Sequence, residues 1–77
     1  MSIQVKLFGP LVDAAGKAEI KIKDIEDTFS LKQEILCQYP AMKDFIFLIS
    51  VNRKIVKENS TLKSGDEIAL LPPFAGG

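Results

Sequence analysis

The sequence predicts a small α+β domain in which one mixed sheet of four to five strands carries one main helix on one face. Short segments of alternating apolar and polar residues, typical of half-buried strands, lie toward both ends of the chain, and a longer segment with helical periodicity lies between them. A chain of 77 residues has room for one domain. With 47% hydrophobic and 26% charged residues, its composition is that of a globular protein and not of a disordered segment.

The first two predicted strands form a hairpin. Residues 3–8 alternate, and this pattern leaves Phe8 as an aromatic on the face that should meet water. Phe8 is either a partly covered edge residue or a contact residue for a partner protein. Gly9 and Pro10 break the strand, and residues 11–15 predict a helical turn that ends at Gly16. Residues 18–23 then alternate again, which completes a hairpin with a rather long loop.

The main helix is predicted to begin between Asp27 and Ser30 and to run to about Tyr39, because Pro40 ends it. Asp27, Thr28 and Ser30 are all suitable N-cap residues, and the sequence does not choose among them. At 100° per residue the helix has one broad apolar face. That face consists of Phe29, Leu31, Ile35, Leu36 and Tyr39.

The remaining strands follow a linker at residues 42–45. They are predicted at residues 47–51, 54–56 and 67–71, with turns at residues 52–53 and 64–66. If Ile68 and Leu70 point inward, the alternation leaves Leu71 exposed beside the C-terminal segment. Three residues are too few to fix the face of the short strand, so the direction of Ile55 stays open.

This order of elements, with one helix on one face of a mixed sheet, is that of the β-grasp or ubiquitin-like fold. In that fold the first and last strands lie side by side in the middle of the sheet, so Phe8 and Leu71 would be neighbours on its open face. We therefore predict a β-grasp domain at residues 1–71, followed by a flexible C-terminal tail at residues 72–77.

The tail carries the functional prediction. Prolines hold φ near about −65°, so Pro72 and Pro73 should end the last strand and direct the tail away from the body. Gly76 and Gly77 have no side chains, so their backbone can enter a slot too narrow for other residues. The alternative is an ordinary chain end, because termini are often disordered and glycine-rich. We favour a working carboxylate at Gly77, since the sequence stops there and the tail has a rigid base.

Composition argues against most other chemistries. Ten basic and ten acidic residues give a net charge of zero, which argues against nucleic acid as the main partner. No apolar run reaches membrane-spanning length, no signal peptide is visible, and a single cysteine fits a cytoplasmic protein. With no histidine in the chain, Cys37 lacks an evident base and is expected to be inert. Neither a metal-ligand cluster nor a phosphate-binding loop is present, so we expect no metal, no bound cofactor and no enzymatic activity of the chain alone.

The terminal residues nevertheless resemble a known family. Residues 70–77 resemble the terminal signature of the MoaD-like family of ubiquitin-like sulfur carriers, the small subunits of molybdopterin synthase. Residues 3–9, 31–40, 51–52 and 62–68 match other parts of that family, so the likeness spans nearly the whole chain. Phe74 departs mildly from the pattern, because the family often has a smaller apolar residue there.

The resemblance implies a mechanism and its partners. An adenylating enzyme, similar to ubiquitin-activating enzymes, would use ATP to form an acyl-adenylate at Gly77, and a sulfur donor would convert it to a thiocarboxylate. The carrier would then dock on the large synthase subunit and give sulfur to a cyclic pyranopterin phosphate in molybdenum cofactor biosynthesis. The resemblance also implies that the tail threads into the partner and that Ile55 joins Phe8 and Leu71 in the partner interface. The threading residues are Pro72, Pro73, Phe74, Ala75 and Gly76.

The free energy gained when the chain binds a partner must offset the conformational entropy lost when the tail becomes ordered. Ordering costs roughly 1–2 kcal/mol per residue. Burial of Phe8 and Leu71 at roughly 1.5–3 kcal/mol each is the obvious source of compensation. Three alternatives stay open: a sulfur carrier for thiamin or for tRNA thiolation, a non-covalent β-grasp adaptor with an idle tail, and a protein modifier that forms isopeptide bonds with lysines.

Overall fold

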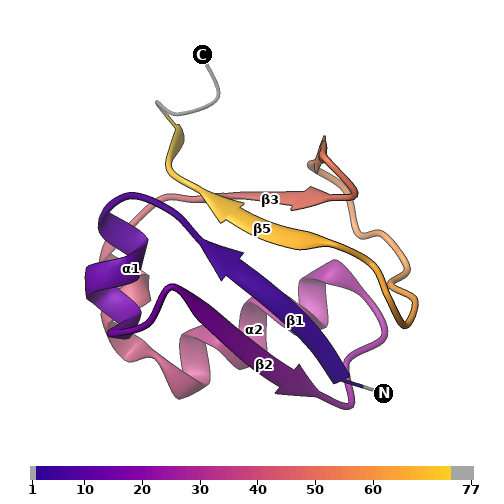
Figure 1. The fold of residues 1–77 in the computed structure, drawn as a ribbon, viewed down its shortest axis with the longest axis horizontal. Helices are drawn as coiled ribbons and strands as arrows, with labels where there is room; N and C mark the ends of the chain where they lie inside the picture. Colours follow the sequence, from indigo (N-terminus) through magenta and orange to yellow (C-terminus); the bar gives the residue numbers. More distant parts are fainter. Residues whose placement is uncertain (1, 74–77) are drawn as a thin grey trace.

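The computed structural model describes residues 2–73 of the chain. Within this range the backbone forms five strands, two α-helices and one 3₁₀ helix. In chain order they are β1 (Ser2–Leu7), α1 (Pro10–Ala15), β2 (Glu19–Lys23), α2 (Thr28–Gln38), η1 (Pro40–Asp44), β3 (Leu48–Val51), β4 (Lys54–Val56) and β5 (Ile68–Leu71). The strands form one mixed sheet, and α2 lies behind it in Figure 1. The predicted β-grasp fold is confirmed.

The first and last strands are neighbours, as predicted. The strand order is β2-β1-β5-β3-β4, and β1 runs parallel to β5 with Leu7 in register with Leu70. The other three pairs are antiparallel, including the predicted β1–β2 hairpin. The central position of β5 brings the end of the described chain beside the end of β1 (Figure 1).

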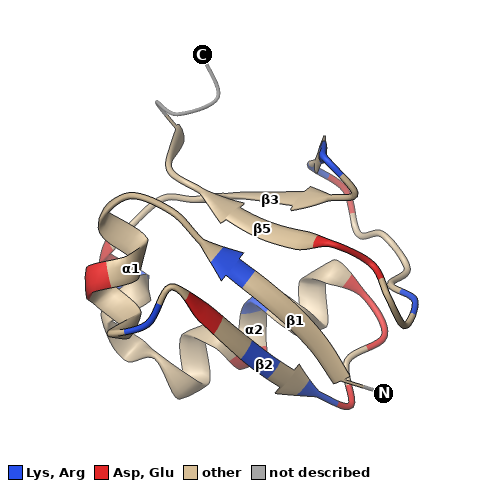
Figure 2. Cartoon of the chain, in the orientation of Figure 1, with Lys and Arg blue, Asp and Glu red and all other residues tan. Residues whose placement is uncertain are grey.

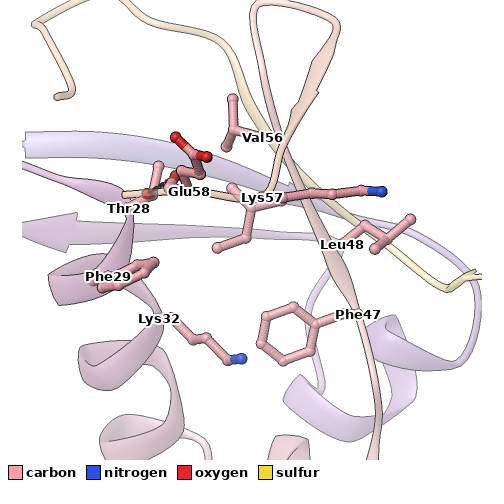
Figure 3. A pocket seen from close by; sticks show the side chains of 9 residues that line it. Thr28, Phe29, Lys32, Phe47, Leu48, Val56, Lys57 and Glu58 are labelled. Carbon is pink, nitrogen blue, oxygen red and sulfur yellow. Dashed lines mark hydrogen bonds between the residues drawn. The ribbon is translucent and has the colours of Figure 1, made fainter. Parts of the chain in front are cut away.

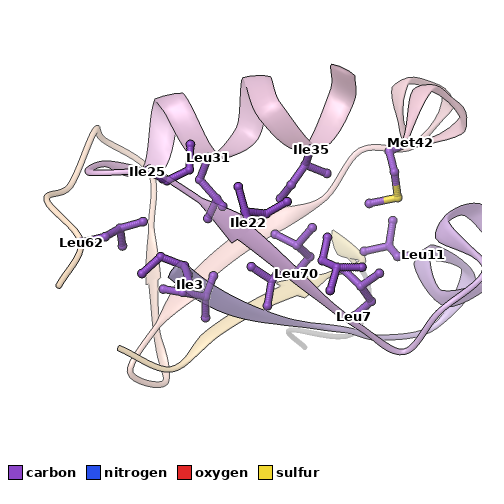
Figure 4. Packing of buried hydrophobic residues seen from close by; sticks show 13 residues of the cluster. Ile3, Leu7, Leu11, Ile22, Ile25, Leu31, Ile35, Met42, Leu62 and Leu70 are labelled. Carbon is purple, nitrogen blue, oxygen red and sulfur yellow. The ribbon is translucent and has the colours of Figure 1, made fainter. Parts of the chain in front are cut away.

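The core fills the space between the sheet and α2 (Figure 4). The inward positions predicted from the alternation are buried on all three long strands, including Val5, Ile22 and Leu70. Because side chains alternate along a strand, the residues between these positions lie on the opposite, open face of the sheet. The complete core cluster is Ile3, Val5, Leu7, Leu11, Ile20, Ile22, Ile25, Leu31, Ile35, Met42, Leu62, Ile68 and Leu70.

Of the three candidates, Asp27 is the N-cap of α2 in the structure. One carboxylate oxygen of Asp27 accepts a hydrogen bond of 2.8 Å from the backbone N–H of Ser30. The prediction that Phe29 extends the buried face is wrong, since Phe29 is 56% exposed and Thr28 is buried instead. Thr28 lies three residues before Leu31 and thus shares its face, whereas Phe29 is rotated about 100° away from Thr28.

The prediction of a linker at residues 42–45 is also wrong. Residues 40–44 form η1, and Met42 on this 3₁₀ helix is fully buried. Pro40 ends α2 as predicted, but it also occupies the first turn of η1, where the missing N–H of proline is not needed. A single short turn of this kind has too few residues to produce a periodic signal in the sequence.

Three hydrogen bonds hold the turns that precede β5 in place. The side chain of Asn52, in the β3–β4 turn, donates to Asp66 at 3.1 Å and accepts from the N–H of Glu67 at 2.9 Å. The other carboxylate oxygen of Asp66 accepts from the N–H of Lys63 at 2.7 Å. These contacts close the predicted turn at residues 64–66 and fix the entry of the chain into β5.

Acid is expected to weaken the fold through Asp27 and Asp66. Hydrogen bonds from the N–H groups of Ser30 and Lys63, respectively, lower the pKa of these carboxyls below the ordinary value of 3.8. A pKa that is lower in the folded than in the unfolded chain stabilises the fold above the unfolded value, and this stability is lost as the pH falls through the folded pKa. We expect the thermal midpoint to drop as the pH falls below about 4.

Substitution of Asp66 tests this expectation. Asp66→Asn places an amide where a carboxylate oxygen accepts from Lys63, so the variant should be less stable at neutral pH and its stability should depend less on acid. Thermal unfolding followed by circular dichroism across this pH range measures both effects. Asp13→Asn is the matched control, because within residues 2–73 the Asp13 side chain makes no hydrogen bond. An equal change in both variants would contradict the assignment.

Candidate functional site

The base of the C-terminal tail is the candidate site. β5 carries the chain to Leu71, after which Pro72 is buried and Pro73 is exposed. The end of the described chain lies beside the β1–α1 connection (Figure 1). The other predicted tail residues, Phe74, Ala75, Gly76 and Gly77, lie outside the described residues. The prediction of a flexible tail at residues 72–77 therefore stays a prediction, although its first proline packs on the body.

Gly9 provides the seat for Pro72. Gly9 caps the N-terminus of α1 with φ 61° and ψ −139°, a backbone conformation that is essentially restricted to glycine. A Cβ atom on Gly9 would lie 3.0 Å from the Cγ atom of Pro72, closer than carbon atoms normally approach. The absence of a side chain at Gly9 therefore lets the base of the tail pack against the β1–α1 loop. From the sequence, Gly9 is predicted only to break the strand, and its contact with Pro72 is evident only from the structure.

Gly9→Ala is expected to destabilise the domain by about 1–3 kcal/mol, because alanine at this φ and ψ is strained. The new methyl group should also displace Pro72. Chemical denaturation measures the change in the free energy of unfolding. Gly65→Ala is the matched control, since Gly65 also has a positive φ, 89°, but a Cβ there meets nothing within 4 Å.

The effect of the contact between residue 9 and Pro72 can be separated from the effect of backbone strain at residue 9. Replacing Pro72 with alanine removes the Cγ atom that the new methyl would meet. In a double-mutant cycle, Pro72→Ala should therefore recover part of the loss caused by Gly9→Ala. Strictly additive free energies would show that Gly9 and Pro72 do not act together.

The three predicted interface residues share the open face of the sheet. Leu71 is in register with Leu48 on β3. Phe8 directly follows Leu7, the partner of Leu70, and therefore lies beside Leu71 at the end of β1. Ile55 is in register with Ser50, which in turn pairs with Ala69 on β5, so the direction of Ile55 that the sequence left open is settled. Phe8 and Ile55 are each 44% exposed, and Leu71 is partly exposed.

Two more residues lie on this face, of which Leu48 was not predicted. Leu48 and Ala69 lie on it through their register with Leu71 and Ser50, respectively. The alternation within residues 47–51 could have indicated Leu48, because it is out of phase with Ile49 and Val51. We call the set Phe8, Leu48, Ile55, Ala69 and Leu71 the tail-side face.

Charge divides the open side of the sheet into two halves. The charged residues lie on β1 and β2, whereas β3 and β5 carry no Lys, Arg, Asp or Glu within their bounds (Figure 2). On the charged half, Lys6 pairs with Glu19, and Gln4 pairs with Lys21. The apolar half includes Leu71, which directly precedes Pro72 at the base of the tail, so a partner that binds the tail would also contact an apolar surface.

The described residues offer little catalytic chemistry. Within residues 2–73 no group of three or more His, Cys, Asp or Glu side chains is arranged to hold a metal ion. Cys37 is exposed on α2, as expected for a surface thiol. No helix in the same range has both the length and the apolar composition needed to cross a bilayer. What the geometry does offer is a firmly seated tail base beside an apolar face.

Comparison with known proteins identifies the family. The model of the ThiS family matches residues 5–77. The chain belongs to the ThiS family. Two relatives align with this ThiS-family chain over their whole length and its own: proteins of Chlamydomonas reinhardtii, 31% identical, and Dictyostelium discoideum, 33% identical. Both are named molybdopterin synthase sulfur carrier subunit, which confirms the family resemblance predicted from the sequence.

Solved structures agree with this assignment. A chain of the complex of subunits 1 and 2 of the molybdopterin-converting factor from Helicobacter pylori is 30% identical, with a TM-score of 0.73 over 100% of both chains. The small archaeal modifier protein 1 from Methanosarcina acetivorans is 29% identical, with a TM-score of 0.83 over 99% of this chain and 96% of its own. The ThiS-family chain therefore shares its whole fold with proteins named as a converting-factor subunit and as a protein modifier.

Proposed function

We propose that this ThiS-family chain is the sulfur carrier subunit of a molybdopterin synthase. The observation that carries the proposal is the match, over the full length of both chains, to relatives named molybdopterin synthase sulfur carrier subunit. The seating of Pro72 and the apolar tail-side face support it, because a carrier needs both a directed tail and a surface that partners recognise.

The chemistry is proposed to take place at Gly77. A carboxylate at neutral pH is a poor electrophile, so an adenylating partner first joins it to the α-phosphate of ATP and releases pyrophosphate. A sulfur donor then displaces AMP and leaves a thiocarboxylate. This group is anionic and nucleophilic, as a thiolate is, so its sulfur can bond to a cyclic pyranopterin phosphate; water then cleaves the bond between that sulfur and the Gly77 acyl carbon and restores the carboxylate. The chain binds no cofactor in this scheme, since ATP belongs to the activating partner.

The body of the domain is proposed to supply recognition. Phe8, Ile55 and Leu71 dock on the adenylating enzyme and on the large synthase subunit, while residues 72–76 pass into the partner. The chain is thus a non-catalytic subunit, and sulfurtransferase activity belongs to the assembled synthase. Because the scheme consumes ATP, we propose that it operates in the cytoplasm.

Intact-mass spectrometry tests the proposal. The chain is co-expressed with its adenylating enzyme and a sulfur donor, and the expected result is a species in which one oxygen is replaced by sulfur. A chain extended by one residue beyond Gly77 is the control and should stay unmodified. An unmodified wild-type chain under these conditions would refute the carrier function. The acceptor pathway is identified by the growth of cells that lack this chain. For the molybdopterin pathway, these cells should fail to grow where molybdenum enzymes are needed and should not need added thiamin.

A second candidate is a protein modifier. It is favoured by the similarity to the small archaeal modifier protein 1 of Methanosarcina acetivorans. A modifier would form isopeptide bonds between Gly77 and lysine side chains of target proteins. Digestion of cell protein and a search for lysines that carry the C-terminal residues of this chain would reveal such conjugates. A thiocarboxylated chain without conjugates would leave the sulfur carrier as the function.

A further inference from the structure

A second apolar surface lies on the opposite side of the sheet from the tail-side face. Among the large apolar side chains exposed within residues 2–73, Phe29 (56%), Phe45 (37%) and Ile46 (79%) belong to α2 or to the segment between η1 and β3. None of the three is on the tail-side face. We call the set Phe29, Lys32, Leu36, Phe45, Ile46 and Phe47 the α2 groove.

The α2 groove is concave. One hollow of about 220 Å³ lies between Phe29 on α2, residues 47–49 at the start of β3, and residues 56–58 at the end of β4 (Figure 3). A second hollow of about 250 Å³ lies between Leu36, Met42 and the segment 45–47. The two hollows share Lys32 and Phe47, so they lie next to each other along α2.

The middle of the groove combines a cation with an aromatic ring. The Nζ atom of Lys32 lies 5.7 Å from the centre of the Phe47 ring, and Figure 3 shows the two side chains next to each other below Phe29. The ammonium group of Lys32 therefore stays over an apolar surface, and its position suits a carboxylate that arrives with an apolar neighbour. This arrangement favours a ligand that is both acidic and apolar.

The charge around the groove points to the same kind of ligand. The residues that line the two hollows include three lysines, Lys32, Lys43 and Lys57, and one acidic residue, Glu58. This local excess occurs in a chain whose net charge is zero. A second copy bound symmetrically would bring these lysines close to their equivalents, which is unfavourable. The concave shape suits an inserted side chain better than a flat lipid surface.

We propose that the α2 groove binds an acidic segment of a partner protein. The segment places an aromatic or aliphatic side chain between Phe29 and Phe47 and its carboxylates beside Lys32 and Lys57. Of the residues that line the two hollows, only Leu48 also belongs to the tail-side face, so the segment binds without covering Phe8, Ile55 or Leu71. The proposal does not depend on the sulfur carrier function.

Selection from a displayed library of random short peptides tests the proposal. The selected peptides should be rich in Asp and Glu next to aromatic or aliphatic residues. Lys32→Glu and Phe29→Ser, both at exposed positions, should each weaken their binding by about tenfold or more. Matched controls on the open face, Lys21→Glu and Phe8→Ser, should leave it unchanged. Circular dichroism checks that all four variants are folded.

Several results would overturn the proposal. The proposal fails if no peptide is selected, if the selected peptides lack acidic residues, or if the peptides lose binding to Phe8→Ser and not to Phe29→Ser. Binding of wild type to phosphatidylglycerol vesicles, lost in Lys32→Glu, would instead assign the groove to a membrane. A dimer in sedimentation that Phe29→Ser abolishes would assign it to a second copy. Thiocarboxylation of Phe29→Ser, measured by mass, tests the carrier function separately.

Discussion

Deletion of Gly77 is expected to abolish sulfur transfer and to leave the free energy of unfolding unchanged. The shortened chain still ends in a glycine carboxylate, but that carboxylate lies about 3.3–3.6 Å closer to the body. Reacting atoms must approach to about 3–3.5 Å, and a misplacement of about 1 Å already costs roughly 100-fold in rate. Since Leu70 is the last core residue within the described chain, the loss of Gly77 should not affect folding.

Two comparisons separate the shorter length of the tail from other causes of lost sulfur transfer. Gly77→Ala keeps the length of the tail and its terminal carboxylate but adds a methyl group, so a loss in this variant would measure how narrow the partner's channel is. Intact mass after co-expression with the adenylating enzyme reports thiocarboxylation, and transfer is measured with the large subunit. If the deletion variant acquires sulfur and transfers it at the wild-type rate, Gly77 is not the working residue.

The fold could be predicted because its strands and main helix have clear periodicity. The alternation at residues 3–8 and 18–23 identified Val5 and Ile22 as core residues, and both are buried. The prediction was wrong where tertiary contacts decided the outcome. Thr28 is buried instead of Phe29 because its hydroxyl accepts from the N–H of Ser60 at 3.0 Å, a contact between residues far apart in the sequence. Met42 is buried through a 3₁₀ turn that has no periodic signal.

The candidate site could be predicted only in part. The alternation predicted that Phe8 and Leu71 lie on the open face, and the family resemblance added Ile55, so these three residues of the tail-side face were predicted before the structure. The alternation within residues 47–51 could have indicated Leu48, but its pairing with Leu71 depends on the strand register and is evident only from the structure. The seat formed by Gly9 for Pro72 joins two distant segments and has no local signature beyond the glycine itself.

Truncation of the tail-side face is expected to weaken the binding of both partners without unfolding the domain. Phe8 is 44% exposed and Leu71 is partly exposed, so docking would bury less than half of each side chain. At roughly 0.7–1.3 kcal/mol for Phe8 and less for Leu71, Phe8→Ala should raise Kd by about 3–10-fold and Leu71→Ala by less. Because Phe8 and Leu71 lie side by side, the double variant should lose less than the sum of the two free energies.

Phe29→Ala is the matched control for this experiment, because it removes the same aromatic ring from an exposed position on the other side of the sheet. Calorimetric titrations with the adenylating enzyme and with the large subunit should show unchanged affinity for this control. Leu71 also packs against Leu48, so thermal unfolding must confirm that Leu71→Ala stays folded at the titration temperature. Equal affinities of wild type, Phe8→Ala and Leu71→Ala for both partners would exclude the tail-side face as the docking surface. The tail would then have to supply the binding energy, and shortening it should weaken binding as well as transfer.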